Sequence, residues 1–363
     1  MGAVIDGHND LPWAMRLLSD YDLDVVDLAA GVPQVQTDIP RLHAGGVTGQ
    51  FWSVYAPSTL PESEAVVVTL EQIHFVQRMV QRYPHVFALA RTADEVERAR
   101  ANGRIASLIG MEGGHSIACS LAVLRMMFDL GARYMTLTHN DNTSWADSAT
   151  DQPEHHGLTD FGRDVVREMN RLGMIVDLSH VSADVMRHAI SASAAPVMFS
   201  HSSARAVCDV PRNVPDDVLQ LLPANGGLCM ITFVAGFVSP AVARWSNELV
   251  EMMREQGGNP GDWQQFEAAA AARSLSEPPP AATIADVVLH LEHVREIAGI
   301  EHVGIGGDFD GTSMLPDGLD DVSGYPRLFD ALRERRWSTT EIEQLSSTNA
   351  LRVLRAAEAT ATA

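Results

Sequence analysis

The segment Gly157–Ser182, GLTDFGRDVVREMNRLGMIVDLSHVS, contains a helix, a strand and the start of a second helix, and it decides the fold class. Thr159 is a suitable N-cap residue, the following apolar residues recur with helical spacing, and Gly173 ends the pattern. Met174–Leu178 is a short apolar run of the kind found in buried strands. Ser182 then opens a second helical pattern. This order predicts a strand between two helices, as in parallel α/β proteins.

The same alternation of short apolar runs and helical patterns extends along the chain. Several runs are continuously apolar, which is typical of strands buried on both faces. We expect strands at Ala3–Asp6, Thr48–Val54, Val86–Ala90, Ile105–Ile109, Tyr134–Thr138, Met174–Leu178, Pro196–Ser200, Gly227–Phe233 and His302–Gly306. Nine strands predict an α/β fold of the (β/α)8 TIM-like barrel type with one extra strand or hairpin. An open doubly wound sheet is the alternative.

One segment interrupts this alternation. Residues 245–280 contain a Gly-Gly-Asn-Pro-Gly turn, an alanine run at Ala268–Ala272 and prolines at Pro278–Pro280. We interpret residues 245–280 as a helical insertion ending in a rigid linker, either a lid or packing arm, or a surface insertion without a catalytic role. Because one barrel accounts for strands from end to end, residues 1–363 are expected to form a single domain.

The charged residues exclude several kinds of chemistry. The chain has 26 Lys+Arg and 47 Asp+Glu residues, a formal net charge of −21, and all of the cationic residues are arginine. Without lysine it cannot hold pyridoxal phosphate or a carbonyl substrate as a Schiff base, supply a P-loop lysine, or bridge two metals with a carboxylated lysine. The acidic balance argues against nucleic acid and anionic membranes as partners.

The cysteines and the N-terminus bear on location. Cys119, Cys208 and Cys229 are an odd number without a CxxC motif, so we expect small buried apolar residues in a reducing compartment. The N-terminus lacks the basic and apolar regions of a signal peptide, and no apolar stretch approaches about 18 residues. We therefore expect a cytoplasmic protein without a membrane partner.

Histidine and carboxylate residues recur where the expected strands end. The residues placed in this way are His8, Asp10, Glu112, His139, His180, His201 and Asp308. In a parallel barrel the carboxyl-terminal strand ends share one mouth, where active sites lie. Imidazole and carboxylate donors together suit zinc. The sequence therefore predicts a metal site at the mouth of the barrel.

The number of ligands bears on the number of metal ions. Four imidazole and carboxylate ligands could close a single site. The five candidates are His8, Asp10, Glu112, His180 and His201. A shared Glu112 would leave His8 and Asp10 on one metal and the two remaining histidines on the other, each metal with a position open for water.

Long motifs surround these residues. They are Asp6–Trp13 (DGHNDLPW), Met111–Ile117 (MEGGHSI), Leu137–Trp145 (LTHNDNTSW), Gly157–Ser182, Phe199–Arg205 (FSHSSAR), Pro211–Asp217 (PRNVPDD), Val303–Gly311 (VGIGGDFDG) and Asn349–Leu354 (NALRVL). With these ordered motifs, which cover nearly the whole chain, the sequence resembles the renal or membrane dipeptidases of the amidohydrolase superfamily.

The resemblance implies a (β/α)8 barrel and a binuclear zinc centre with two Zn²⁺ per chain, held by the same five residues. It also implies that Asp308 handles a proton, that His139 contacts the substrate at the reacting centre, and that Arg212 receives the substrate's terminal carboxylate. The implied activity is hydrolysis of small L-Xaa-L/D-Xaa dipeptides by a metal-bridging hydroxide, and a homodimer is a further expectation. The rival interpretations are a related amidohydrolase acting on N-acyl amino acids, deaminase substrates or β-lactam-like amides, and a scaffold without catalysis.

The chain departs from the family pattern near the expected pocket. Relatives have Asn-Phe-Tyr where this chain has Thr232-Phe233-Val234. We therefore expect a different pocket shape and a different preference for substrate side chains. Mammalian relatives are secreted, lipid-anchored and disulfide-linked, and this sequence carries no signal for any of these properties.

Overall fold

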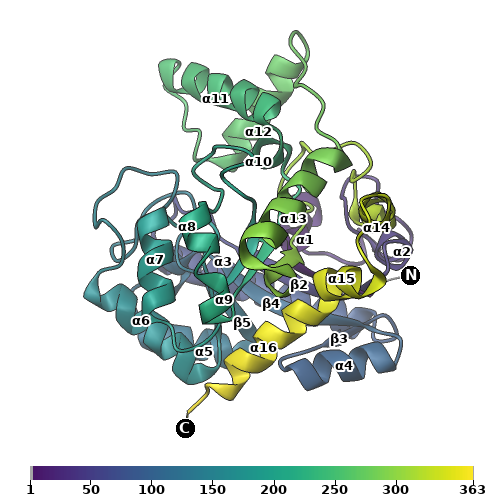
Figure 1. Ribbon diagram of the computed structural model, residues 1–363, viewed down its shortest axis with the longest axis vertical. Coiled ribbons are helices and arrows are strands. Elements are labelled where there is room, and N and C mark those ends of the chain that lie inside the picture. Colours follow the sequence, from purple (N-terminus) through teal and green to yellow (C-terminus); the bar gives the residue numbers. More distant parts are fainter. Residues whose placement is uncertain (1–2, 363) are drawn as a thin grey trace.

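The computed structural model describes residues 3–362, and at its centre lies a barrel of parallel strands surrounded by helices (Figure 1). The strands in this range are β1 (Val4–Asn9), β2 (Val47–Tyr55), β3 (Phe87–Leu89), β4 (Ile105–Glu112), β5 (Ala132–Thr136), β6 (Ile175–Asp177), β7 (Met198–Ser202), β8 (Leu228–Ile231) and β9 (Val303–Ile305). The barrel strands follow the order β1-β2-β4-β5-β6-β7-β8-β9. A parallel bridge between Asn9 and Phe309 brings the two ends of this order together and nearly closes the ring. The predicted (β/α)8 TIM-like barrel is confirmed.

The extra strand is β3. It pairs with Ile105–Ser107 in the first half of β4, whereas β5 pairs with Ile109–Met111 in the second half. The same edge of β4 therefore pairs with β3 in its first half and with β5 in its second half, and β3 stays outside the ring. This arrangement accounts for the ninth apolar run that the sequence contains.

Helices cover the outside of the barrel. They are α1 (Leu11–Ser19), α2 (Ile39–Ala44), α3 (Glu62–Arg82), α4 (Ala93–Ala101), α5 (Leu121–Leu130), α6 (Asp160–Leu172), α7 (Ala183–Ala192), α8 (Asp216–Leu219), α9 (Leu222–Asn225), α10 (Ala235–Val238), α11 (Pro240–Glu255), α12 (Trp263–Ser274), α13 (Ile284–Ala298), α14 (Tyr325–Glu334), α15 (Thr339–Glu343) and α16 (Asn349–Ala359). The side chain of Thr159 caps α6, Gly173 ends it with a φ of 78°, and Ser182 caps α7. The helix–strand–helix unit predicted from residues 157–182 is therefore present.

The barrel interior is filled at one end and polar at the other. The side chains in its buried cluster include Ile5, Phe51, Leu108, Tyr134, Ile175, Met198 and Met230. Val353 and Leu354 of α16 join this cluster, so the C-terminal helix covers one end of the barrel. Leu108 and Glu112 are four residues apart on β4 and share its inner face. Glu112 therefore points into the barrel at the opposite, carboxyl-terminal end.

The segment expected to be an insertion is helical. Helices α11 and α12 stand apart from the barrel at the top of Figure 1. They pack on each other through a small cluster of their own that includes Trp245, Leu249, Met253 and Ala270. Helix α11 begins at Pro240, before the expected boundary at residue 245. The amide of Asn140 donates a hydrogen bond of 3.3 Å to the carbonyl of Gly261, so the loop between α11 and α12 reaches the rim of the barrel beside His139.

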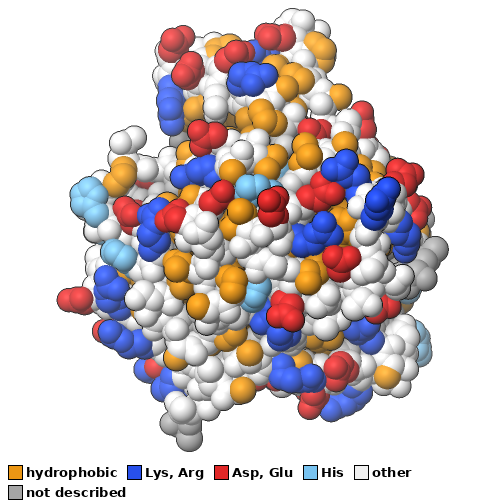
Figure 2. Space-filling model, in the orientation of Figure 1, with side chains coloured by type: hydrophobic (Ala, Val, Ile, Leu, Met, Phe, Trp, Pro, Cys, Tyr) orange, Lys and Arg blue, Asp and Glu red, His pale blue; other side chains and the backbone are white. Residues whose placement is uncertain are grey.

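The surface is charged but mixed in sign. On the face shown in Figure 2, arginine and acidic side chains are interspersed. Within residues 3–362, no helix combines the length and the apolar character needed to cross a bilayer.

Cys208 and Cys229 are buried as expected, whereas the expectation was wrong for Cys119, which is exposed at the start of the loop before α5. Cys119 lies just after the 3-10 helix Gly114–Ile117. Its backbone has a φ of 49°, in the left-handed region, and the chain turns outward from the core there.

Candidate metal centre

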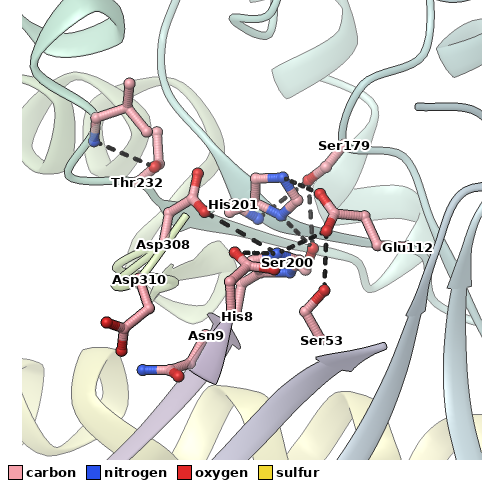
Figure 3. A network of polar contacts seen from close by, with 12 residues as sticks. His8, Asn9, Ser53, Glu112, Ser179, Ser200, His201, Thr232, Asp308 and Asp310 are labelled. Atoms are coloured by element: carbon pink, nitrogen blue, oxygen red, sulfur yellow. Dashed lines mark hydrogen bonds and ion pairs between the residues drawn. The ribbon is translucent and has the colours of Figure 1, made fainter. Parts of the chain in front are cut away.

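The side chains predicted to meet at the barrel mouth lie together there. They are His8 of β1, Asp10 directly after β1, Glu112 at the end of β4, His139 after β5, His180 after β6, His201 of β7 and Asp308 after β9. Each of these residues is buried. Figure 3 shows His8, His201, Asp308 and Glu112 converging from different strands. Because each side chain follows or ends a parallel strand, the topology alone brings them to one mouth.

Glu112 lies between two groups of donor atoms. Its Oε2 is 3.3 Å from Nε2 of His8 and accepts a 2.8 Å hydrogen bond from Oγ of Ser53. Its Oε1 is 3.0 Å from Nε2 of His180 and 3.5 Å from Nε2 of His201. The two carboxylate oxygens therefore face different histidines.

The donor atoms have the spacing of a metal site. Ligands about 2.1 Å from a tetrahedral zinc lie roughly 3.4 Å from one another. The described residues include three such groups: His8 with Glu112 and His201, Glu112 with His139 and His180, and His8 with Asp10 and Asp308. In each group the donor atoms lie within 4.8 Å of one another. These residues fit a cation, and their mixture of imidazole and carboxylate fits zinc.

Two of the histidines face each other through their ring nitrogens. Nε2 of His180 and Nε2 of His201 are 2.9 Å apart. Burial lowers the pKa of both rings well below the usual range, so both are neutral. On the other side of Glu112, Nε2 of His8 is buried without a hydrogen-bond partner among the described residues. A bound cation would satisfy these nitrogens, because neutral imidazole ligates metals through its free nitrogen.

The carboxylates on the His8 side are tightly packed. Oδ2 of Asp10 lies 3.3 Å from Nε2 of His8, and Oδ1 of Asp308 lies 4.0 Å from the same atom. A Cβ atom at Gly311 would come within 2.4 Å of Asp10 Oδ2 and 2.3 Å of Asp308 Oδ1, so glycine is needed there. Burial, together with the charges of Asp10 and Glu112, holds the pKa of Asp308 well above its usual range. A carboxyl with a raised pKa is suited to exchanging a proton near neutral pH.

Two of these residues have strained backbones. His180 has a φ of 69° and Asp308 a φ of 63°, both in the left-handed region that non-glycine residues rarely adopt. His180 lies three residues beyond the end of β6, and Asp308 lies three residues beyond the end of β9. Such strain, about 1–3 kcal/mol for each residue, is typical of functional sites, where the surrounding structure fixes the conformation.

His139 lies at the edge of the centre. Its Nε2 is 3.8 Å from Glu112 Oε1, and its ring packs on those of Tyr55 and His180. Burial lowers the pKa of His139 to about 4, so the ring is neutral and keeps one N–H to donate. Its Nδ1 has no hydrogen-bond partner within residues 3–362.

Arg212 lies beside the centre as a buried cation. Its residue is 3% exposed, and Nη2 donates a weak 3.4 Å hydrogen bond to the carbonyl of His201. The guanidinium stacks on the ring of Phe237 at 5.2 Å, and Nη1 has no hydrogen-bond partner among the described residues. Burial lowers the pKa of Arg212 to about 10, so it remains charged at neutral pH. A buried guanidinium with free donors is a ready site for a carboxylate.

Several residues that support the centre were not identified from the sequence. They are Asp6, Ser53, Tyr134, Asp177 and Ser200. Oη of Tyr134 lies 2.8 Å from Nδ1 of His8. Asp6 accepts hydrogen bonds from the backbone N–H of His8 and from that of Gly307. A signal existed for the two aspartates, because a charged residue inside an apolar strand is buried only when it has partners.

Comparisons with known proteins identify the family. A profile of the family described as "Membrane dipeptidase (Peptidase family M19)" matches residues 2–363. This chain belongs to that family. Among the relatives of this M19 member, Dipeptidase 3 of Rattus norvegicus is 41% identical over 360 residues, covering 98% of this chain and 65% of the relative. An uncharacterized dipeptidase of Schizosaccharomyces pombe is 42% identical over 369 residues, covering 98% of this chain and 81% of the relative.

Solved structures share the fold of this M19 member. The probable dipeptidase PvdM from Pseudomonas aeruginosa has a TM-score of 0.85 at 23% identity, covering 99% of this chain and 96% of that one. A metallopeptidase from Rhodobacter sphaeroides, liganded with a phosphinate mimic of the dipeptide L-Ala-D-Ala, has a TM-score of 0.80 at 24% identity, with 98% and 99% covered. The chain spans about 65% of the length of the rat relative.

Proposed function

We propose that this chain is a zinc-dependent dipeptidase that cleaves the peptide bond of small dipeptides with a free C-terminal carboxylate. The observation that carries the proposal is Arg212, a buried guanidinium with an unpartnered Nη1 beside the metal ligand His201. A substrate carboxylate would satisfy this cation and set the distance from the chain end to the bond that is cleaved. A carboxylate one residue beyond the scissile bond means that a single C-terminal residue is released, as in the cleavage of a dipeptide.

The proposal includes two zinc ions per chain. His8 and Asp10 with Glu112 Oε2 would hold one, and His180 and His201 with Glu112 Oε1 would hold the other. Glu112 Oε2 lies near His8 and Oε1 lies near His180, and these separate positions support the division. When bound, the metal ions would supply Lewis acidity and would lower the pKa of a bound water toward neutrality.

The protein side chains supply the remaining functions. Arg212 binds the carboxylate and orients the peptide. The neutral ring of His139, 3.8 Å from Glu112, donates its N–H to the carbonyl oxygen as negative charge develops there. Asp308, whose pKa burial raises, accepts a proton from the attacking water and passes it to the leaving amine. The limited exposure of these residues keeps bulk water away from the reacting groups.

Substrate preference and location are part of the same proposal. We propose that both L- and D-residues are accepted at the C-terminal position, because Arg212 recognises a carboxylate that both stereoisomers carry. We propose a reducing, cytoplasmic setting, which is supported by three cysteines in the thiol form. The Thr232-Phe233-Val234 segment after β8 borders this region, so its side chains are proposed to tune the preference.

The test is a substrate screen of the zinc-loaded protein. The library varies both side chains and the C-terminal stereochemistry, and it includes N-acyl amino acids and a β-lactam as rival substrates. Elemental analysis of the same preparation is expected to give about two zinc per chain. We expect dipeptides to be the best substrates. If the zinc-loaded protein hydrolyses no dipeptide, or prefers N-acyl amino acids, the proposed substrate class is wrong.

A further inference from the structure

A chain of buried hydrogen bonds runs from Asp177 on β6 to the ring of His201 on β7. Oγ of Ser200 donates to Oδ2 of Asp177 at 2.6 Å and lies 2.8 Å from Nδ1 of His201. Asp177 and Ser200 are fully buried, and His201 is nearly so. Figure 3 shows Ser200 close to His201, and Glu112 Oε1 lies 3.5 Å from the other ring nitrogen, Nε2. These hydrogen bonds therefore reach Nδ1 of His201, whereas Nε2 of the same ring faces the metal centre.

The direction of these hydrogen bonds follows from the donors around Asp177. Its Oδ1 accepts from the backbone N–H of Ser179 and from that of Ser200, at 3.2 Å and 2.8 Å. Its Oδ2 accepts from the hydroxyl of Thr136 at 2.7 Å as well as from Ser200. Four donors converge on this carboxylate, so it acts as an acceptor throughout.

The tautomer of His201 follows from this direction. A serine hydroxyl has one hydrogen, and Ser200 gives it to Asp177. The short contact between Ser200 Oγ and His201 Nδ1 is then a hydrogen bond donated by the ring. Nδ1 therefore carries the proton, and Nε2 presents its lone pair toward Glu112 Oε1 and His180 Nε2. This is the form of imidazole that ligates a metal.

The other two histidines of the centre lack this support. Nδ1 of His180 is buried and has no hydrogen-bond partner in the described part of the chain. Nδ1 of His8 lies 2.8 Å from the phenol oxygen of Tyr134, which is a neutral partner. Among residues 3–362, His201 is the only one of these three whose Nδ1 is linked to a carboxylate, through Ser200. The connection therefore supports the donor atoms near Glu112 Oε1, which belong to His180 and His201.

We propose that Asp177 is a positioning residue that acts through Ser200 to fix the tautomer of His201 and thereby strengthens the metal position formed by His180 and His201. The proposal rests on the proposed function only for the identity of the metal. Partners of this kind are typically worth about 10–100-fold in metal affinity. The effect is expected to fall mainly on this position, because the hydrogen bonds of Asp177 among the described residues go to Thr136, Ser179 and Ser200 and none goes to His8 or Asp10.

The experiment measures zinc affinity by chelator competition in the full-length protein. Asp177→Asn and Ser200→Ala are each expected to weaken one zinc about 10–100-fold and to change the other less than about threefold. Thr136→Val is the matched control, because it removes a hydrogen bond to the same carboxylate and leaves the path to His201 intact. Its zinc affinities are expected to stay within about threefold of the wild type. Circular dichroism shows that each variant is folded, and Ser200→Ala serves if Asp177→Asn does not fold.

A second measurement reads the tautomer directly. In ¹⁵N-histidine-labelled protein, the His201 ring is expected to show a protonated Nδ1 in the wild type and a loss of that signal's hydrogen-bonded character in Ser200→Ala. Unchanged affinity for both zinc ions in folded Ser200→Ala would overturn the proposal. An equal loss in Thr136→Val would also overturn it, because the effect would then be one of packing. Dipeptide hydrolysis is assayed separately, so two bound zinc ions without hydrolysis would count against the proposed function and not against the proposed role of Asp177.

Discussion

The ring of Tyr134 occupies the space that a side chain at Gly110 would need. Gly110 on β4 and Tyr134 on β5 pair with each other on adjacent strands of the barrel. A Cβ atom at position 110 would lie 2.0 Å from Cζ of the Tyr134 ring. The absent side chain lets the ring lie inside the barrel, where its hydroxyl reaches Nδ1 of His8. Gly110 thus leaves the space in which Tyr134 contacts His8 of the candidate metal centre.

Gly110→Ala is therefore expected to disturb both packing and the metal centre. The added methyl group forces Tyr134 to move, and overpacking of this kind costs about 1–3 kcal/mol. Urea denaturation is expected to show that loss, and chelator competition a weaker zinc site at His8. Gly236→Ala is the control, because its nearest neighbour would be 3.4 Å away, an ordinary contact. Equal stability of Gly110→Ala and wild type would contradict the described packing.

Asp308 and Asp310 provide a matched pair for the proposed proton transfer. Both follow β9 and both have left-handed backbones, but Asp308 faces His8 whereas Asp310 hydrogen-bonds the backbone of Gln36 (Figure 3). Asp308→Asn is expected to lower kcat by about 100–10,000-fold, the usual contribution of general acid–base catalysis. Asp310→Asn keeps an acceptor for Gln36 and is expected to retain kcat within about threefold. Equal losses in the two variants, with zinc content unchanged, would remove Asp308 from its proposed role.

The pH dependence of stability has a contribution from Glu168 on α6. Hydrogen bonds from Arg171 and Arg125, which outweigh the partial burial, lower the pKa of Glu168 from 4.5 to about 2. A lowered pKa means that the ionised carboxylate stabilises the folded state above pH 4.5, and that this contribution fades as the pH falls toward 2. Glu168→Gln is therefore expected to cost about 1–2 kcal/mol at pH 7 and progressively less in acid.

Urea denaturation between pH 7 and pH 3 measures this difference. Asp164→Asn is the control on the same helix, because Asp164 pairs with Arg167 at an exposed position and such pairs contribute little. A constant difference between Glu168→Gln and wild type across this pH range would show that the ion pairs are not responsible.

The barrel could be predicted from the sequence because its signals are local. The run Met174–Leu178 is apolar apart from Asp177, and Thr159, Gly173 and Ser182 mark the neighbouring helix ends within the same short segment. The meeting of the candidate metal-binding residues could also be predicted, since each lies near the end of a strand and parallel strands share one mouth. The barrel topology then brings His8 and Glu112 together without further information.

The supporting residues could not be predicted because they depend on register between strands. Tyr134 reaches His8 only because β5 pairs with β4 at the level of Gly110. Asp177 reaches His201 through Ser200 because β6 and β7 pair at Asp177 and Met198. A single sequence does not contain these alignments. The exposure of Cys119 likewise depends on a left-handed turn that its composition does not reveal.

Arg212 is proposed to select substrates that carry a free carboxylate at the metal centre. The most direct measurement compares kcat/KM for one dipeptide and for its C-terminal amide, in wild type and in Arg212→Met. A bidentate hydrogen bond to a charged group is worth roughly 3 kcal/mol, so the wild type is expected to prefer the free acid by about 100-fold. In Arg212→Met this preference is expected to vanish through a higher KM for the free acid, with zinc content unchanged. Equal wild-type rates for acid and amide, or a preference that survives in Arg212→Met, would contradict the account.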